Sequence, residues 1–86
     1  MHLSAEQLAI ASRIDAKVQR LMAEGADDIA IFVEMSDEMP AFKRLLDSGH
    51  PTMDALCLRF GGFYRYAKIL EAIAVGIASG EIRVPK

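Results

Sequence analysis

The residues best suited to chemistry in this 86-residue sequence are two histidines, one cysteine and two pairs of adjacent acids. His2 lies beside the first residue and His50 precedes a proline, and neither is spaced from a serine or from Cys57 as in known nucleophile signatures. Cys57 lies between two leucines, which favours a buried small hydrophobic residue over a nucleophile. We therefore expect His50 in a turn or helix cap, no catalytic residues, and a protein that is not an enzyme.

The paired acids and the paired glycines do not predict a metal or cofactor site. Asp27-Asp28 and Asp37-Glu38 lack the alternating oxygen ligands and central glycine of a calcium loop, and acids at helix starts explain them more simply. Zinc requires clustered cysteine and histidine ligands. Gly61-Gly62 is not followed by the Lys-Ser/Thr of a phosphate loop. The sequence predicts neither a metal nor a cofactor.

One group of side chains has the outline of a nucleic-acid contact. Residues 52–73 are expected to form a helix, a Gly-Gly turn and a second helix, with Arg59, Arg65 and Lys68 around the turn and Tyr64 and Tyr66 beside them. A helix-turn-helix reader places such side chains at the start of its second helix. However, this second helix is mostly apolar, and the chain has a net charge of −2. A compact DNA-binding regulator is therefore the alternative interpretation.

The first helix that must position these residues has clear signals at both ends. Ser4 and Gln7 have capping-box spacing, and Leu3 and Leu8 have the spacing of a hydrophobic staple. Gly25 is suited to end the helix in the left-handed conformation. An apolar residue recurs every three or four positions, which predicts one buried stripe of Ile10, Ile14, Val18 and Leu21.

Residues 28–35 can be interpreted in two ways. Ile29, Ile31 and Val33 have high strand propensity in a short run, but no second run of similar quality exists for pairing. We predict a short buried helix capped by Asp27 or Asp28. The alternative is a strand that pairs with its own copy across a dimer.

Two further helices are expected between residues 36 and 60. Ser36 should cap the first, with Pro40 in its first turn and residues 48–51 ending it. Thr52 should cap the second, and Gly61-Gly62 should break the chain after it. The inward side chains are predicted to be Phe42, Leu45 and Leu46 in the first helix and Leu56, Cys57 and Phe60 in the second.

The last helix carries the most informative pattern. Its large apolar residues are spaced 3, 4, 3 and 4 apart, the seam of a helix that packs along a partner. Ala72, Gly76 and Gly80 form a stripe of small residues that suits close approach of another helix. Because residues 72–80 carry no charge, we expect this part to be covered on nearly every side, and Ile82 and Val84 to attach the tail as an extended strand end. The predicted packing or dimer interface is Phe63, Tyr66, Leu70, Ile73, Gly76 and Ile77.

Composition supports one small helical domain that associates with itself. Residues 1–86 should form a single all-α domain, a compact bundle of four to five helices with the apolar C-terminal helix as its central element. A chain this short buries only part of its surface, yet 52% of its residues are hydrophobic. We therefore predict a protein–protein interaction or regulatory protein that forms a homodimer and contacts another protein.

Charge and hydropathy also bear on partners and location. Residues 1–43 contain eight acids and four bases (−4), and residues 44–86 contain six bases and four acids (+2). This charge difference is consistent with ordinary solvated helix faces. The alternative is that it favours head-to-tail contact between protomers or contact with a basic partner. The small net charge does not favour an anionic membrane. We find no run of about 20 uncharged apolar residues and no secretory signal at the start, and so expect no membrane partner and a cytoplasmic location.

Overall fold

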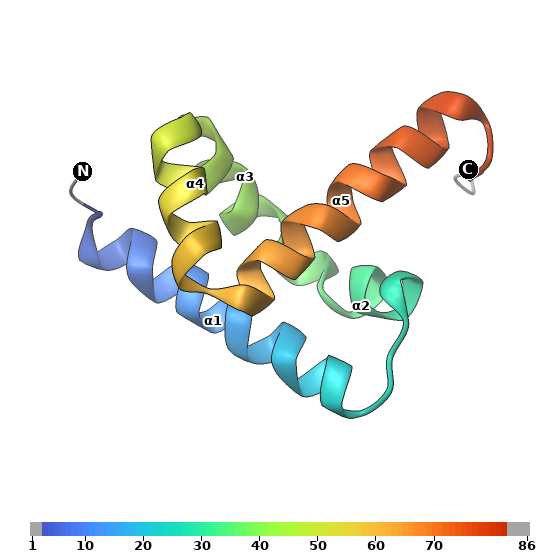
Figure 1. Ribbon diagram of the computed structural model, residues 1–86, viewed down its shortest axis with the longest axis horizontal. Helices are drawn as coiled ribbons and strands as arrows, with labels where there is room; N and C mark the ends of the chain where they lie inside the picture. Colours follow the sequence, from blue (N-terminus) through green and yellow to red (C-terminus); the bar gives the residue numbers. More distant parts are fainter. Residues whose placement is uncertain (1–2, 83–86) are drawn as a thin grey trace.

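Local hydrogen bonds at both ends define the first helix, α1, which spans Ala5–Ala23. The computed structural model describes residues 3–82 (Figure 1). The Ser4 hydroxyl accepts from the Gln7 amide at 3.1 Å, and the Gln7 side chain accepts from the Ser4 amide at 2.8 Å. At the other end Gly25 has φ 84° and the Ala26 amide donates to the Leu21 carbonyl at 3.0 Å, which is a Schellman turn. The predicted capping box, glycine stop and buried stripe are confirmed.

Residues 28–35 are mostly helical, so the strand alternative was wrong. Helix α2 spans Asp28–Glu34, and the Asp27 carboxylate caps it by accepting from the Ala30 amide at 2.8 Å. A capped turn satisfies the backbone of a short segment that has no strand partner. Burial is confined to one face: Ile31 is 1% exposed, whereas Ile29 and Val33 are 53% and 60% exposed.

The next helix begins later than Ser36. A 3₁₀ turn, Ser36–Glu38, precedes α3, Met39–Asp47, and no side chain caps either element. The turn is closed by the Glu38 amide, which donates to the Met35 carbonyl at 2.9 Å, so the cap predicted for Ser36 is not needed. Pro40 lies in the first turn of α3 as predicted. Phe42 and Leu45 are buried, but Leu46 is 53% exposed, contrary to the expectation that it points inward.

Helix α4, His50–Arg59, begins two residues before the predicted cap. Gly49 takes the N-cap position at φ 103°, which favours glycine, and Thr52 is a buried residue of the first turn instead. His50 is the first helical residue. Leu56 is fully buried, whereas Cys57 and Phe60 are only half-buried. The chain bends at Phe60, in extended conformation, and not at the two glycines, which belong to α5.

Helix α5, Gly61–Ser79, is the central element of an all-α bundle. It packs against α1, α2 and α4, while α3 reaches it through Phe42, whose ring contacts Phe63 and Tyr66. Between residues 3 and 82 there are five α-helices, one 3₁₀ turn and no strand, which confirms the predicted fold class. None of the helices in this described part is both long and apolar enough to cross a membrane. The carboxyl half of α5 extends beyond the other helices (Figure 1).

Candidate protein-interaction surface

An apolar groove of about 710 Å³ lies between α3 and α5, with α2 contributing Phe32. We call it the α3–α5 groove. Lys43 is the one charged residue in its lining. Its lining consists of Phe32, Met39, Pro40, Phe42, Lys43, Leu46, Leu70, Ile73, Ala74 and Ile77.

The α3 wall of the groove follows from helical spacing. Met39, Lys43 and Leu46 are four and three residues apart, which places them on one face of α3. Met39 and Leu46 are 39% and 53% exposed, and they lie together on this face. Phe42 forms the floor, because its ring packs at 5.3 Å from Phe63 and is therefore buried. Leu46, unlike Phe42, lies on the wall of the groove, and its side chain is therefore exposed.

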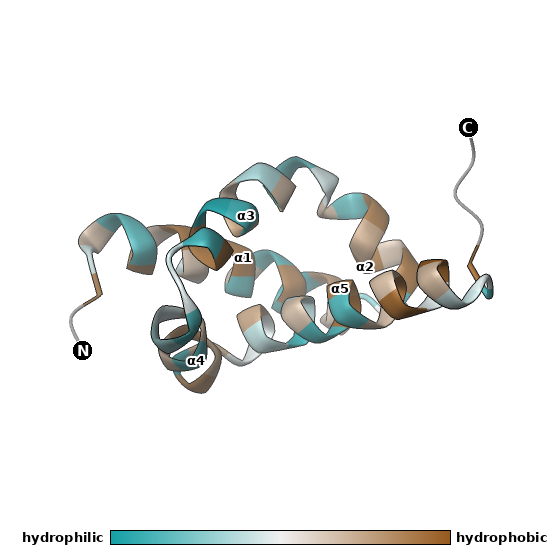
Figure 2. Ribbon diagram, turned by 90° about the horizontal axis from the view of Figure 1, so that it is seen from above, coloured by the Kyte–Doolittle hydropathy of each residue, from teal (hydrophilic) through white to brown (hydrophobic). Residues whose placement is uncertain are grey.

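The α5 wall continues into a helix end that lacks cover. Between residues 72 and 79, which we call the outer half of α5, only Ile73 and Gly76 are buried. Val75 and Ile77 are 63% and 44% exposed, and no residue here is charged (Figure 2). The expectation that this part is covered on nearly every side is wrong for a single chain. A helix that is apolar all round is normally buried.

The small-residue stripe has a different neighbour from the one predicted. Ala72 and Gly80 are exposed, and Gly76 faces the side chain of Ile82 and not another helix. The Ile82 amide donates to the Gly76 carbonyl at 3.0 Å, which turns the chain back over the helix end. Ile82 therefore does hold the tail, in a bend and not in a strand, while Val84 lies outside the described residues.

Two further exposed apolar residues lie on α2, the helix that contributes Phe32 to the groove. Ile29 and Val33 are four residues apart, so they share a face of α2 next to Phe32, which lines the groove. We call the α3–α5 groove, the outer half of α5 and these two residues together the apolar interaction surface.

Burial divides the residues predicted for the helix interface. Phe63 and Tyr66 are fully buried and Ile73 is 7% exposed, so these three belong to the core of one chain. Leu70 is half-buried and Ile77 is 44% exposed, and both line the groove, as does the edge of Ile73. Sequence reasoning missed Ile69, which is 2% exposed. A 3.6-residue period that continues from Tyr66 to Ile69 and Ile73 would have found it.

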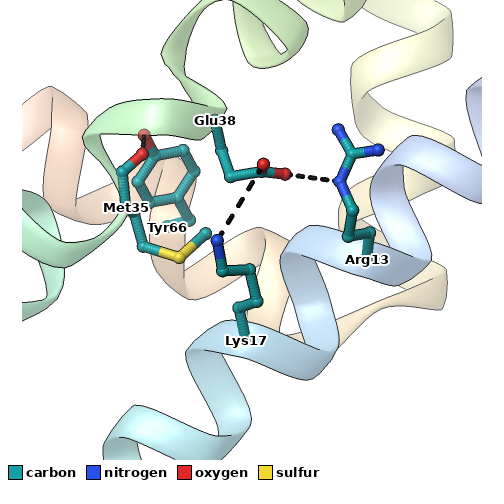
Figure 3. Close-up of polar contacts among 5 residues, drawn as sticks. All are labelled: Arg13, Lys17, Met35, Glu38 and Tyr66. Atoms are coloured by element: carbon teal, nitrogen blue, oxygen red, sulfur yellow. Dashed lines mark hydrogen bonds and ion pairs between the residues drawn. The ribbon is translucent and has the colours of Figure 1, made fainter.

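A buried acid holds the start of α3 in place (Figure 3). The Glu38 carboxylate accepts from Arg13 Nε at 2.7 Å and has Lys17 Nζ at 4.0 Å, so it ties the 3₁₀ turn to α1. On the other side the Tyr66 hydroxyl donates to the Met35 carbonyl at 3.3 Å. Burial, with a further contribution from the negative charge of Glu38, raises the pKa of Tyr66 to about 12. These contacts fix one end of the groove.

A second acid, which sequence reasoning did not single out, fixes the start of α5. Asp15 Oδ1 accepts from the Gly62 amide at 2.6 Å, where α5 has no side-chain cap of its own. A carboxylate at a helix N-terminus also offsets the positive end of the helix dipole. The spacing of 47 residues leaves no local signal for this contact.

Local contacts occupy the basic residues named for DNA binding. Arg65 pairs with Asp28 of α2 at 2.7 Å, and Arg59 lies over the Phe60 ring at 5.7 Å. Lys68, on the following turn of α5, contacts Glu71 and the Tyr64 ring. Pairs as exposed as Arg65–Asp28 are individually weak, so they compete only modestly with a phosphate.

The aromatic residues near the turn are divided between surface and core. Lys68 pairs with Glu71 at 3.6 Å and lies over the Tyr64 ring at 5.7 Å. Tyr64 is 48% exposed, but Tyr66, expected beside the bases, is fully buried. Only one of the two tyrosines can therefore take part in a surface contact.

The cysteine is in an environment that keeps its thiol protonated. Burial is the main cause that raises the pKa of Cys57. The negative charge of Asp54 raises this pKa further, and the positive charge of Lys68 lowers it. Within residues 3–82, no three His, Cys, Asp or Glu side chains gather as a metal site would require.

No protein-family model, curated protein or solved structure matches this chain.

Proposed function

We propose that this chain is a non-enzymatic helical interaction or regulatory protein that forms a homodimer through the apolar interaction surface and contacts another protein in turn. The observation that carries the proposal is the uncharged, exposed outer half of α5 beside an apolar groove. Helix-in-groove contacts and helical dimer seams use this kind of surface.

The energetics favour a partner that brings an equal apolar surface. Six large side chains of the apolar interaction surface are between 39% and 63% exposed. Covering their exposed parts in two copies would contribute on the order of 10–20 kcal/mol. Association costs about 4–15 kcal/mol. Because the two ranges overlap, the dimer is stable only if both copies bury most of this surface. The six residues are Ile29, Val33, Met39, Leu46, Val75 and Ile77.

The proposal is tested by the mass in solution of matched charge variants. Ile77→Lys places a cation in the last turn of α5, where the helix dipole tolerates it and where the side chain is already exposed. We expect wild type to be dimeric at micromolar concentration by light scattering, and Ile77→Lys to be a folded monomer.

The control is Leu58→Lys, near the end of α4. Leu58 is 90% exposed and lies outside the lining of the α3–α5 groove. The Leu58→Lys variant should leave the dimer intact. A wild-type monomer across a hundredfold dilution, or equal loss of the dimer in both variants, would contradict the proposal.

DNA binding is the alternative function, and substitution of the three basic residues tests it. If Arg59→Ala, Arg65→Ala and Lys68→Ala together abolished binding to a specific duplex, and that binding weakened steeply with salt, the alternative would replace this proposal. Under the proposal, the triple variant keeps its fold and still forms a dimer, with only the loss of the Lys68 charge weakening that dimer.

A further inference from the structure

We propose that the α3–α5 groove is occupied by the outer half of α5 from a second copy, antiparallel to the first, with its carboxyl end beside Lys43. The inference rests on the proposed homodimer and specifies how its two copies fit together.

The outer half of α5 has the surface that such a groove requires. A helix that lies between two walls contacts apolar side chains on both sides, so it must be apolar over more than one stripe. On this helix Ala74 and Ile77 face the groove side, and Val75 is exposed on the opposite side. Ordinary amphipathic helices, such as α1, have one buried stripe only. The chain thus carries both the groove and a helix suited to fill it.

Charge complementarity fixes which end of the helix lies where. The last carbonyls of α5 carry the negative end of the helix dipole, the last turn contains no basic residue, and the acid Glu81 follows the glycine stop. Lys43 is the one charged residue that lines the groove. Through residue 82 the carboxyl end of this apolar helix is negative, and it matches an apolar groove with a single positive side chain; Arg83 and Lys86 follow it in the sequence.

The antiparallel arrangement satisfies this match in both copies at once. Leu46 borders both the groove and a neighbouring hollow lined by Ala67 and Lys68, so the carboxyl end of α3 lies beside the middle of α5. A two-fold axis near Ala74 sets each Gly80 level with Lys68 of the other copy, because both are six residues from Ala74. The negative helix end then falls between Lys43 and Lys68. A parallel pair would leave Lys43 without that partner.

A charge-reversal cycle tests the arrangement by the dissociation constant of the dimer. Lys43→Glu and Glu81→Lys should each weaken the dimer by roughly threefold to tenfold, because each puts like charges together. The double variant restores an opposite-charge pair at position 43 but leaves the new lysine near Lys68, so it should bind more tightly than either single variant and less tightly than wild type. Arg44→Glu is the matched control, because it makes the same change of charge one residue along α3, outside the groove lining.

The outcomes separate this inference from the proposed function. If wild type is a dimer but the double variant is no tighter than the two single variants, or Arg44→Glu weakens it as much as Lys43→Glu, the placement of α5 is wrong and the homodimer stands. If wild type is a monomer, the proposed function fails first.

Discussion

Asp15 caps the start of α5 as Ser4 caps the start of α1, but the Asp15 carboxylate comes from a neighbouring helix. Its carboxylate meets the Gly62 amide at 2.6 Å, and such an approach is open only while residue 62 has no side chain. A Cβ on Gly62 would lie 2.5 Å from the Asp15 carbonyl oxygen and 3.0 Å from its Cα, and those are backbone atoms that move only with α1 itself. A Cβ on Gly61 would meet only Gln19 Nε2, at 3.8 Å.

The two adjacent glycines should therefore respond in opposite ways to the same substitution. We expect Gly62→Ala to lower the free energy of unfolding by about 1–3 kcal/mol, because α1 and α5 must separate. Gly61→Ala should be neutral or slightly stabilising, since alanine is the better helix former. Urea unfolding of both variants checks this. Equal effects would show that the contact between α1 and α5 is not tight.

The buried hydroxyl of Tyr66 predicts a pH dependence at the alkaline end. Its pKa in the folded protein is about 12, against 10.0 for the unperturbed group, because burial disfavours the phenolate and Glu38 adds to the effect. A pKa raised on folding gives stability that is complete below pH 10 and is lost as pH rises to 12, on the order of 3 kcal/mol in all.

Tyr66→Phe isolates this titration. The variant should lose about 0.5–1.5 kcal/mol at neutral pH, because the Met35 carbonyl loses its donor, and should then show a shallower decline in unfolding free energy above pH 10. Tyr64→Phe, at a half-exposed position, is the control and should follow wild type. If the Tyr66→Phe profile keeps the wild-type slope, the hydroxyl is not the titrating group.

Among the elements, those defined by local signals were the ones predicted well. The capping box at Ser4 and the stop at Gly25 place both ends of α1, since all the hydrogen bonds involved lie within a few residues. The start of α4 was misplaced because Gly49 and Thr52 both suit a helix start, and the packing of Thr52 against the core decides between them. Ser36 failed as a cap because the chain continues into it from Met35 as a 3₁₀ turn.

The candidate surface could be predicted only in part. The 3–4 spacing identified Leu70 and Ile77, yet it could not separate residues that face the groove from those that face α1, because that depends on the angle at which helices cross. The groove itself depends on Glu38, whose ion pair with Arg13 spans 25 residues and has no sequence signature.

At the end of α5, Gly76 and Ile82 should be coupled. A Cβ on Gly76 would collide with the far end of the Ile82 side chain, which is flexible and can move. In an Ile82→Ala background, Gly76→Ala should stabilise by about 1 kcal/mol, the helix propensity difference. In wild type the gain should be smaller, because Ile82 must be displaced. A double-mutant cycle by urea unfolding measures the difference. Identical gains in both backgrounds would mean that Ile82 does not cover Gly76.

At the scale of the whole molecule, α5 serves two purposes along its length. Its inner half supplies Phe63, Tyr66 and Ile69 to the core, so the fold depends on it. Its outer half contributes little to that core and leaves apolar surface exposed, which is unfavourable for an isolated domain unless a second chain covers it. Folding and association would then share one helix.

This sharing predicts that thermal stability depends on protein concentration. If unfolding and dissociation of the dimer are coupled, raising the concentration about a hundredfold in the micromolar range should raise Tm by roughly 5–8 °C for a dimer of this size. Ile77→Lys, which we expect to be monomeric, should show a Tm that does not change with concentration and lies below that of the wild-type protein at high concentration. Leu58→Lys should retain the wild-type dependence, because Leu58 lies outside the groove lining. Differential scanning calorimetry over the concentration series checks all three, and a wild-type Tm independent of concentration would show that the outer half of α5 is not covered by a second copy in solution.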